Sequence, residues 1–520
     1  MKNQNYPLYE VESPNNLKVL LNQVADKYGD NSAFTFERKK ETINVSYRQL
    51  KTETEALGAA FFDMGIQNTK IAVIGENSYE WILTYFSTVN SGNVIVPIDK
   101  ELPMEDIKTL VEHSETVVFV YSNTYADVAT YLKENVSTVQ QYIGMNYLIE
   151  LIEKGKELIQ NGNKHIVDFE VDNYSMTALL YTSGTTGNSK GVMLTHEGLV
   201  KSAIGASKNI LFLESGLLVL PLHHCFALNA VVLTMLISGA TIIINQSLKN
   251  IQSDMAKYKP RNTFMVPLLV ETFYKQIHAM AKGSSDSEVL KKIASAAFGG
   301  NLEIIVSGGA PLDRKYIDGY RKVGISILEG YGLTECSAVV SVNRNQWYRV
   351  GSVGQVVDTC EVKIFEPDAN GHGEIYVKGD IVMLGYYKNE HATKDTFDDG
   401  WLKTGDIGYL DDEGFLYISG RKKNVIILSN GTNVYPEEVE FAMLKYISYM
   451  KEVVVSAGDN EIIAEVFLDT DNHPNCTSLL ESDIIGFNRT LPIYKNIGKT
   501  IIRETQFPKT TTKKIKRQYN

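Results

Sequence analysis

The sequence predicts an α/β protein with a mainly parallel sheet, followed by a smaller C-terminal α+β segment. Short apolar runs alternate with amphipathic stretches as far as about residue 340, and strand, helix and strand at this spacing form βαβ units. Beyond that point, short alternating strands separated by Asp, Asn and Gly turns predict a small antiparallel or barrel-like subdomain.

The first predicted elements are two helices. Residues 17–28 place their apolar side chains on one helical face, and Gly29 is expected to end this helix. Ser46 and Gln49 have the spacing of a capping box ahead of a second helix over residues 50–65.

A βαβ unit is expected next. Residues 70–75 and 93–98 are apolar runs typical of buried strands, and residues 77–92 between them are typical of a capped helix. The longest apolar run, residues 227–245, is interrupted by Asn, Thr, Ser and Gly. This favours a buried helix followed by a strand over a membrane span.

The C-terminal part has a different pattern. Residues 360–380 and 414–420 contain the short strands of the barrel-like subdomain, and an α+β segment follows with a helix over residues 435–447. We predict a domain boundary near Lys423. The expected domains are residues 1–422, with a barrel-like subdomain over about 340–420, and residues 423–520.

Bulk properties narrow the function classes. A chain of 520 residues suits two to four domains, and a net charge of −11 argues against a general nucleic-acid or anionic-membrane surface. The first residues lack the apolar core of a signal peptide. The cysteines are scattered without metal-ligand spacing. These observations predict a cytoplasmic protein without an integral membrane segment.

One loop has the composition of a phosphate-binding site. The stretch "YTSGTTGNSKGVMLTH" spans residues 181–196, and its Gly- and Thr-rich part lies between two apolar segments typical of strands. A Walker A loop is excluded, because Asn188 and Ser189 separate Gly187 from Lys190. A flexible surface linker is the ordinary alternative, but a tight loop between two strands favours a site.

Further motifs occur in a fixed order along the chain. They are "LPLHHCFALN", "SGGAPL", "EGYGLTE", "WLKTGDIGYLDDEGFLYISGRKKNVI" and "FPKTTTKKIKR". Together with the Gly/Thr loop they resemble the adenylate-forming superfamily of acyl-CoA synthetases, peptide-synthetase adenylation domains and luciferases, and they are most similar to bacterial fatty acyl-CoA synthetases. The resemblance covers nearly the whole chain. It implies a large N-terminal domain of two mainly parallel α/β sheets plus a small β-barrel, followed by a small mobile α+β domain.

The resemblance also implies the reaction and its cofactors. A carboxylate attacks the α-phosphorus of ATP, giving acyl-AMP and pyrophosphate, and the thiol of coenzyme A then attacks the acyl carbon and expels AMP. The Gly/Thr loop is expected to close over the β- and γ-phosphates. The implied nucleotide-contacting residues of this loop are Thr182, Ser183, Gly184, Thr185, Thr186, Gly187 and Lys190.

Other motifs carry the remaining nucleotide contacts that the resemblance implies. Tyr331 offers a flat face for adenine, Thr334 a hydroxyl for phosphate, and Glu335 an oxygen ligand for Mg²⁺, with Thr186 as the second metal ligand. Taken alone, Glu335 has an ordinary alternative as a solvated carboxylate in a loop. The other implied cofactor-binding residues are Gly309 and Ala310 near the purine, Asp406 and Arg421 at the ribose, and Pro311, Glu329, Gly330 and Gly332.

The acyl pocket is expected directly after His223 and His224, the residue pair in the motif "LPLHHCFALN". His224 resembles the gate between the acyl pocket and the thiol tunnel, and His223 is the second candidate. An isolated histidine beside apolar residues is more often a packed core residue. Phe226 and Ala230, with Gly308, are the implied pocket residues, and the "ALN" run is shared with aryl-CoA ligases, so chain length stays open.

The C-terminal segment is expected to provide the catalytic lysine. Lys514 matches that lysine, although Lys513 stands where glycine is usual and is an alternative. Lys423 matches the hinge, and Gly431 lies in the segment that resembles the pantetheine tunnel. The implied catalytic residues are Lys514, His224, Glu335 and Thr186.

The leading hypothesis is an ATP- and Mg²⁺-dependent acyl-CoA synthetase that acts on a medium- or long-chain fatty acid. One rival is an acyl-AMP ligase or stand-alone adenylation enzyme that loads a separate acyl carrier protein. A second rival is a nucleotide-binding protein without catalysis, against which the presence of Lys190, Glu335, Asp406 and Lys514 argues. No nucleic-acid partner is expected, and the sequence leaves the oligomeric state open.

Overall fold

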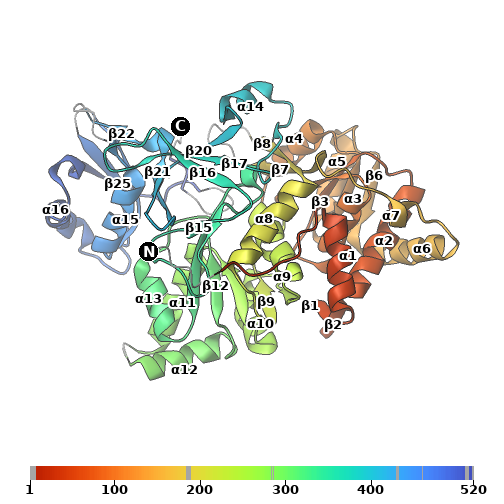
Figure 1. Ribbon diagram of the computed structural model, residues 1–520. Coiled ribbons are helices and arrows are strands. Elements are labelled where there is room, and N and C mark those ends of the chain that lie inside the picture. The colour runs from red at the N-terminus through yellow and green to blue at the C-terminus, as the bar shows by residue number, and fades with distance from the viewer. Residues whose placement is uncertain are drawn as a thin grey trace. The chain divides into compact units, whose positions relative to one another are not determined.

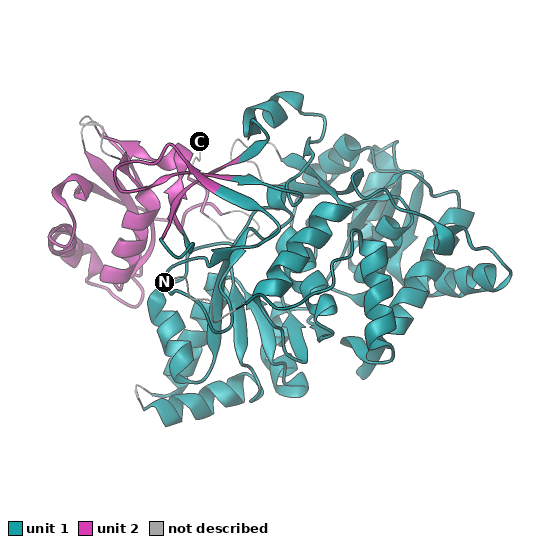
Figure 2. Ribbon diagram, in the orientation of Figure 1, with its two compact units in different colours: residues 1–362, 377–402, 412–416 teal, residues 363–376, 403–411, 417–520 magenta. Residues whose placement is uncertain are grey.

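Two parallel-stranded sheets organise the larger part of this computed structural model (Figure 1). The structure describes residues 7–182, 189–282, 284, 286–428, 433–458, 461–509 and 515–517. The chain divides into two compact units, of which the first contains residues 1–362, 377–402 and 412–416 (Figure 2). The second contains residues 363–376, 403–411 and 417–520.

The larger sheet of the first unit has nine strands in the order β15-β14-β13-β12-β11-β9-β10-β1-β2. The strands from β13 to β1 are all parallel to their neighbours, whereas β14, β15 and β2 pair in antiparallel fashion. The bounds are β1 Ser32–Arg38, β2 Glu41–Ser46, β9 Ser215–Leu218, β10 Thr241–Ile244, β11 Asn262–Met265, β12 Ile304–Ser307, β13 Ser326–Tyr331, β14 Ser341–Val342 and β15 Gln355–Val356.

The second sheet of this unit has seven strands in the order β18-β8-β7-β4-β3-β5-β6. Its strands from β7 to β6 are parallel, and β8 and β18 extend it in antiparallel fashion. The bounds are β3 Lys70–Ile74, β4 Val94–Pro97, β5 Val118–Tyr121, β6 Gln141–Gly144, β7 Met176–Thr182, β8 Lys190–Thr195 and β18 Gly385–Tyr386. These two sheets confirm the expected α/β class with mainly parallel strands.

Helices connect and cover these strands. The longer ones are α1 Leu17–Tyr28, α2 Tyr47–Asp63, α3 Tyr79–Asn90, α4 Met104–Ser114, α5 Ala126–Asn135, α6 Leu148–Gln160, α8 His196–Asn209, α10 Ile251–Tyr258, α11 Pro267–Met280, α12 Ser287–Ala297 and α13 Arg314–Lys322. The shorter ones are η1 Asn123–Tyr125, η2 Met145–Tyr147, α7 His165–Asp168, the π-helix η3 Phe226–Leu233, α9 Thr234–Ile237, η4 Leu248–Asn250, η5 Thr334–Cys336 and α14 Glu390–Thr396. A short hairpin joins β19 Phe397–Asp398 to the start of β20.

Helix α8 is buried around nearly its whole circumference, because it contacts elements of both sheets. It follows β8 directly and packs on β8, on β14 and on the π-helix η3. In Figure 1 it lies in the middle of the unit, between the two sets of strands. The hairpin that carries the Gly/Thr loop is therefore attached to a central helix.

Several local predictions are confirmed. Helix α1 spans the expected residues and ends at Gly29, which has φ +49°. The hydroxyl of Ser46 accepts a hydrogen bond from the amide of Gln49 and caps α2, which confirms one half of the predicted capping box, whereas the Gln49 side chain donates to Glu53. The strands β3 and β4 are parallel and are joined by α3, which is the expected βαβ unit.

The second unit contains most of β17 and β20, the end of β16, and nearly all of β21. Within it the strand order is β16-β17-β20, with β21 paired to β20. The whole elements are β16 Glu361–Phe365, β17 Gly373–Lys378, β20 Trp401–Leu410, β21 Leu416–Arg421, η6 Lys422–Asn424, β22 Ile426–Ile427 and β23 Asn433–Val434.

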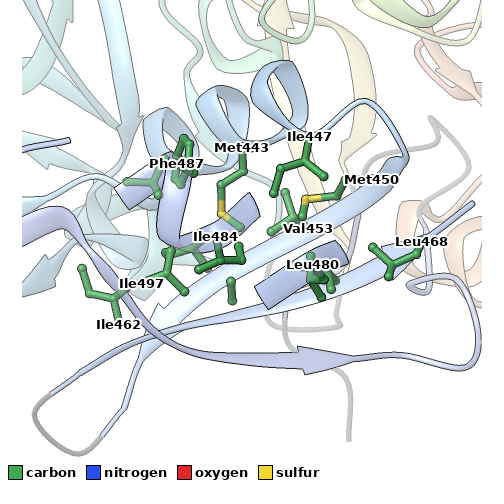
Figure 3. Close-up of a cluster of buried hydrophobic side chains, with 14 of the residues drawn as sticks. Met443, Ile447, Met450, Val453, Ile462, Leu468, Leu480, Ile484, Phe487 and Ile497 are labelled. Carbon is green, nitrogen blue, oxygen red and sulfur yellow. The ribbon is translucent and has the colours of Figure 1, made fainter. Parts of the chain in front are cut away.

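The rest of this unit is an α+β layer with its own hydrophobic core. A three-stranded sheet in the order β24-β25-β26 packs with two helices, and Figure 3 shows their side chains meeting. Met443 of α15 and Phe487 of α16 are fully buried there, beside Val453 and Ala464 of the sheet. The bounds are α15 Pro436–Tyr446, β24 Met450–Ala457, β25 Ile462–Leu468, α16 Cys476–Asn488, η7 Ile493–Lys495 and β26 Ile497–Ile502.

Within the described part of the chain, no helix combines the length and apolarity needed to cross a bilayer. The apolar run 227–245 forms the π-helix η3, the short helix α9 and the strand β10, as expected. The domain boundary near Lys423 stays a prediction.

Candidate nucleotide and acyl site

Three of the predicted motifs follow parallel strands of the nine-stranded sheet, in which β12 and β13 are neighbours and β11 separates β9 from β12. The segment with His224 follows β9, the segment 308–311 follows β12, and the segment 332–335 follows β13. The carboxyl ends of parallel strands lie at one edge of a sheet, and ligands of open α/β sheets bind at this edge. The topology therefore brings these motifs together.

Side-chain contacts confirm that the motifs are close. A Cβ atom on Gly308 would lie 3.4 Å from Cζ of Phe226, so the aromatic ring packs against the glycine. Burial, and then the negative charge of Glu335, raise the pKa of the Cys225 thiol to about 12. Cys225 lies between His224 and Phe226 in the chain, so this segment is near the carboxylate of Glu335.

The predicted pocket residues Phe226 and Ala230 both belong to the π-helix η3. The π-helix is rare and occurs often at functional sites. Ala230 is only 5% exposed. The buried side chain of Asn229 donates a hydrogen bond to the carbonyl of Ser337, which ties this helix to the turn after Glu335.

The two histidines differ in their surroundings. The Nε2 atom of His223 lies 3.3 Å from Oδ1 of Asp99, and the His223 ring packs on the His224 ring with 4.2 Å between centroids. Burial, and then the neighbouring His224, lower the pKa of His223. The assignment of His224 as the gate stays a prediction.

The turn that carries Glu335 is tightly constrained. A Cβ at Gly332 would lie 1.7 Å from the carbonyl oxygen of Ala338, so only glycine fits. Ser337 and Ala338 have φ values of +53° and +93°, and residues other than glycine rarely adopt this backbone conformation. Unfavourable backbone of this kind persists only where the surroundings hold it, and it clusters at functional sites.

The carboxylate of Glu335 suits the predicted metal role. Its Oε1 accepts a hydrogen bond of 2.9 Å from the hydroxyl of Tyr386. Across the described ranges, no group of three or more His, Cys, Asp or Glu side chains could form a complete metal cage. A single carboxylate is nevertheless what Mg²⁺ uses when substrate phosphates and water complete its shell. The residues present therefore fit Mg²⁺ bound together with a nucleotide.

The predicted purine-binding turn follows β12. Gly309 has φ +83°, a conformation that favours glycine, and residues 309–311 are exposed. In the neighbouring strand β13, Glu329 is paired with Ser307 in parallel register. Burial raises the pKa of Glu329 to about 7, although its Oε2 accepts a weak hydrogen bond of 3.4 Å from the amide of Gly351.

The Gly/Thr loop connects the antiparallel strands β7 and β8. Thr182 and Lys190 are direct partners at the ends of these strands. The Nζ atom of Lys190 lies 4.7 Å from the ring centroid of Tyr386. The predicted residues Ser183, Gly184, Thr185, Thr186 and Gly187 lie outside the described residues.

The predicted ribose residues form an ion pair in the second unit. The Nε atom of Arg421 lies 2.8 Å from Oδ1 of Asp406. The amide of Asp406 donates to the hydroxyl of Thr404, and the Arg421 guanidinium lies near the Thr404 carbonyl. Partial burial, followed by the charges of Arg421 and Arg517, lowers the pKa of Lys423.

The C-terminal segment is anchored on both sides of the predicted catalytic lysine. Lys509 and Ile515 pair as an antiparallel bridge, and Lys509 forms an ion pair with Glu452. Arg517 forms an ion pair with Glu440. Lys513, Lys514 and the predicted tunnel residue Gly431 lie outside the described residues.

Sequence patterns missed two residues of this site. Tyr386 and Asn229 both hold the Glu335 turn, yet each lies far from it in the chain. The only sequence signal for Tyr386 is an aromatic pair after Gly385, which does not indicate a partner.

The fold and these residues define an adenylate-forming enzyme. Residues 21–387 match the model of the family described as AMP-binding enzyme. Because this match covers well over half of the chain, the chain belongs to the AMP-binding enzyme family.

Relatives with known names support this membership. The chain is 30% identical to the long-chain-fatty-acid–CoA ligase FadD15 of Mycobacterium bovis over 82% of this chain and 78% of the relative. It is 29% identical to the 2-succinylbenzoate–CoA ligase of Listeria monocytogenes over 94% of this chain and 95% of the relative.

Solved structures share the fold. The O-succinylbenzoate coenzyme A synthetase of Bacillus subtilis, in complex with ATP and a magnesium ion, matches with a TM-score of 0.75 and 24% identity. The match covers 96% of this chain and 98% of that chain. At this identity the likeness shows the fold.

Proposed function

We propose that this protein is an ATP-dependent acyl-CoA ligase that activates a medium- or long-chain fatty acid and transfers the acyl group to coenzyme A. The observation that supports this most strongly is the meeting of Glu335, the His224–Phe226 segment and Gly308 at the carboxyl edge of one parallel sheet. These residues belong to three separate motifs, so their meeting depends on the fold.

The first half-reaction would form acyl-AMP. A carboxylate oxygen of the fatty acid attacks the α-phosphorus, and pyrophosphate leaves. Both reactants are anions, so the residues at the site must offset their repulsion. Lys190 and Lys514 would supply positive charge, and Asp406 would hold the ribose hydroxyls. Mg²⁺ held by Glu335 would neutralise phosphate charge.

The second half-reaction would form the thioester. The thiol sulfur of coenzyme A attacks the acyl carbon, the bond to the phosphate oxygen breaks, and AMP leaves. His224 would act as the gate between the acyl pocket and the thiol path.

The composition of the pocket helix favours an aliphatic acid. Named relatives act on both long-chain fatty acids and 2-succinylbenzoate. The latter carries a second carboxylate, which would need a cationic partner. Residues 226–233 contain no charged side chain, and their one polar side chain, Asn229, donates to Ser337. An apolar lining suits an alkyl chain.

A panel of acids tests the proposal. The purified protein is incubated with ATP, Mg²⁺, coenzyme A and one acid at a time, including fatty acids of graded length, benzoate and 2-succinylbenzoate. AMP and acyl-CoA are measured separately. We expect both products with medium- or long-chain fatty acids.

Two outcomes would contradict the proposal in different ways. A preference for 2-succinylbenzoate over every fatty acid would overturn the choice of substrate. Acyl-AMP that forms without any thioester, until an acyl carrier protein is added, would replace coenzyme A with that protein as acceptor.

A further inference from the structure

Tyr386 lies between two residues with predicted roles at the phosphates. Its hydroxyl donates a hydrogen bond of 2.9 Å to Oε1 of Glu335, and its ring centroid lies 4.7 Å from Nζ of Lys190. Its side chain is buried, with 7% exposure. One side chain therefore contacts both the predicted metal ligand and the lysine at the base of the Gly/Thr loop.

Backbone pairing fixes Tyr386 relative to Lys190. Strand β18, which consists of Gly385 and Tyr386, pairs with β8, and Tyr386 lies opposite Val192. The amide of Tyr387 donates a 2.8 Å hydrogen bond to the carbonyl of Gly191, the residue after Lys190. The ring of Tyr386 and the ammonium of Lys190 thus sit on paired strands of one sheet.

The same segment also holds Glu335. The amide of Met383 donates a 2.9 Å hydrogen bond to the carbonyl of Glu335. The hydroxyl of Ser337 donates a 2.8 Å hydrogen bond to the carbonyl of Ile381. Oε1 of Glu335 is engaged by Tyr386, and no described residue donates a hydrogen bond to Oε2. This arrangement leaves Oε2 available for a ligand.

We propose that Tyr386 is a positioning residue for the nucleotide and metal site. Its hydroxyl fixes the rotamer of Glu335 and leaves Oε2, which would hold Mg²⁺, and its ring holds the ammonium of Lys190 by a cation–π contact. This inference rests on the proposed function, because it needs Glu335 to bind Mg²⁺ and Lys190 to bind phosphate.

A purely structural role makes a different prediction. If Tyr386 only fills space in the core, a phenylalanine at this position should behave like the wild type toward ligands. If the hydroxyl orients Glu335, the same change should weaken binding of the Mg²⁺ complex of ATP and leave metal-free ATP unaffected. Tyr386→Phe therefore separates the two roles.

Direct binding measurements provide the test. Affinity for ATP is measured by isothermal titration calorimetry, with Mg²⁺ and with EDTA, for wild type, Tyr386→Phe and Tyr386→Leu. Tyr387→Phe is the matched control, because its hydroxyl donates instead to Glu115, which has no predicted role at the site. Thermal unfolding of each variant monitors the fold.

Each variant has a distinct expected result. Tyr386→Phe should raise the Kd for MgATP about tenfold, as loss of a hydrogen bond to a charged group implies, and leave the Kd for ATP in EDTA within about twofold. Tyr386→Leu should weaken both, because Lys190 also loses its ring. Tyr387→Phe should match the wild type.

A double-mutant cycle with Glu335→Gln makes the assignment specific. In the Glu335→Gln background, Tyr386→Phe should have little further effect on MgATP binding, since the two residues act as one unit. Equal MgATP affinity of Tyr386→Phe and wild type, or additive effects in the cycle, would overturn the inference. If the wild type itself binds no MgATP, the proposed function is what fails. Tyr386→Phe keeps the buried ring, so it tests the role of the hydroxyl even if Tyr386→Leu is unstable.

Discussion

The guanidinium of Arg421 lies 2.8 Å from the carboxylate of Asp406. The Arg421 side chain is 48% exposed, whereas the Asp406 side chain is only 6% exposed. Both residues match predicted ribose contacts. The buried carboxylate is thus held in place by a cation that solvent and ligands can still reach.

The Arg421 pair can be tested by replacing the arginine. Arg421→Ala should lower the free energy of unfolding by about 1–3 kcal/mol, because a buried carboxylate loses a charged partner, and it should also weaken ATP binding. Lys422→Ala is the matched control. It breaks the adjacent 2.7 Å ion pair with buried Glu374 and should lower stability without changing ATP affinity. Urea denaturation and calorimetry measure the two effects, and equal ATP affinity of both variants would exclude a ribose role for Arg421.

The size of the acyl pocket should follow the volume at Gly308 and Ala230. A Cβ on Gly308 would lie 3.4 Å from the ring of Phe226, so Gly308→Ala adds a methyl group in van der Waals contact with that ring at the predicted pocket. We expect Gly308→Ala and Ala230→Trp to shorten the preferred fatty acid, and Phe226→Ala to lengthen it. Each methylene should change kcat/KM by about 10- to 200-fold, which corresponds to about 1–3 kcal/mol of transition-state binding free energy. An unchanged profile across acids of graded length in all three variants would remove these residues from the pocket.

The two half-reactions should depend on different parts of the C-terminal segment. Lys514→Ala should abolish most acyl-AMP formation and leave thioester formation from supplied acyl-AMP nearly intact. Lys423→Pro should have the reverse effect, because proline fixes φ at the predicted hinge. Both half-reactions are assayed separately in each variant. Full adenylation by Lys514→Ala would point to Lys513, and equal loss of both steps would argue against a division of labour.

Glu329 should make stability depend on pH. Burial raises its pKa from 4.5 to about 7 in the folded protein. Between these two values the folded protein binds more protons at this carboxyl than the unfolded chain does, so the free energy of unfolding falls as the pH rises. Above about pH 7 the stabilising contribution of the protonated Glu329 carboxyl is fully lost.

Glu329→Gln should remove this contribution, because the amide does not ionise. The difference in the free energy of unfolding between the variant and the wild type is measured at pH 4.5 and at pH 8. It should shift by about 1–3 kcal/mol in favour of the variant from the lower pH to the higher one. Urea denaturation at a series of pH values measures the difference. Burial also raises the pKa of Glu440 to about 7. Glu440 therefore makes the free energy of unfolding fall with rising pH in both proteins, and this effect cancels in their difference. A constant difference between the two proteins across this pH range would contradict the assignment.

The sequence by itself determined the elements whose signals are local. Gly29 ends helix α1, and Ser46 caps α2 through a neighbour three residues away. The fold class followed in the same way from the alternation of apolar runs and helices. The order of the motifs likewise predicted the family, because each motif is a short run of residues.

Tertiary structure alone decided which distant side chains meet. Tyr386 reaches Glu335 across 51 positions of the chain, and Asn229 reaches Ser337 across 108. Neither contact has a periodic or local signal, because both depend on how β18, η3 and η5 are placed by the sheets. The raised pKa of Glu329 also required the fold, since burial depends on all the surrounding elements and not on the neighbouring residues in the sequence.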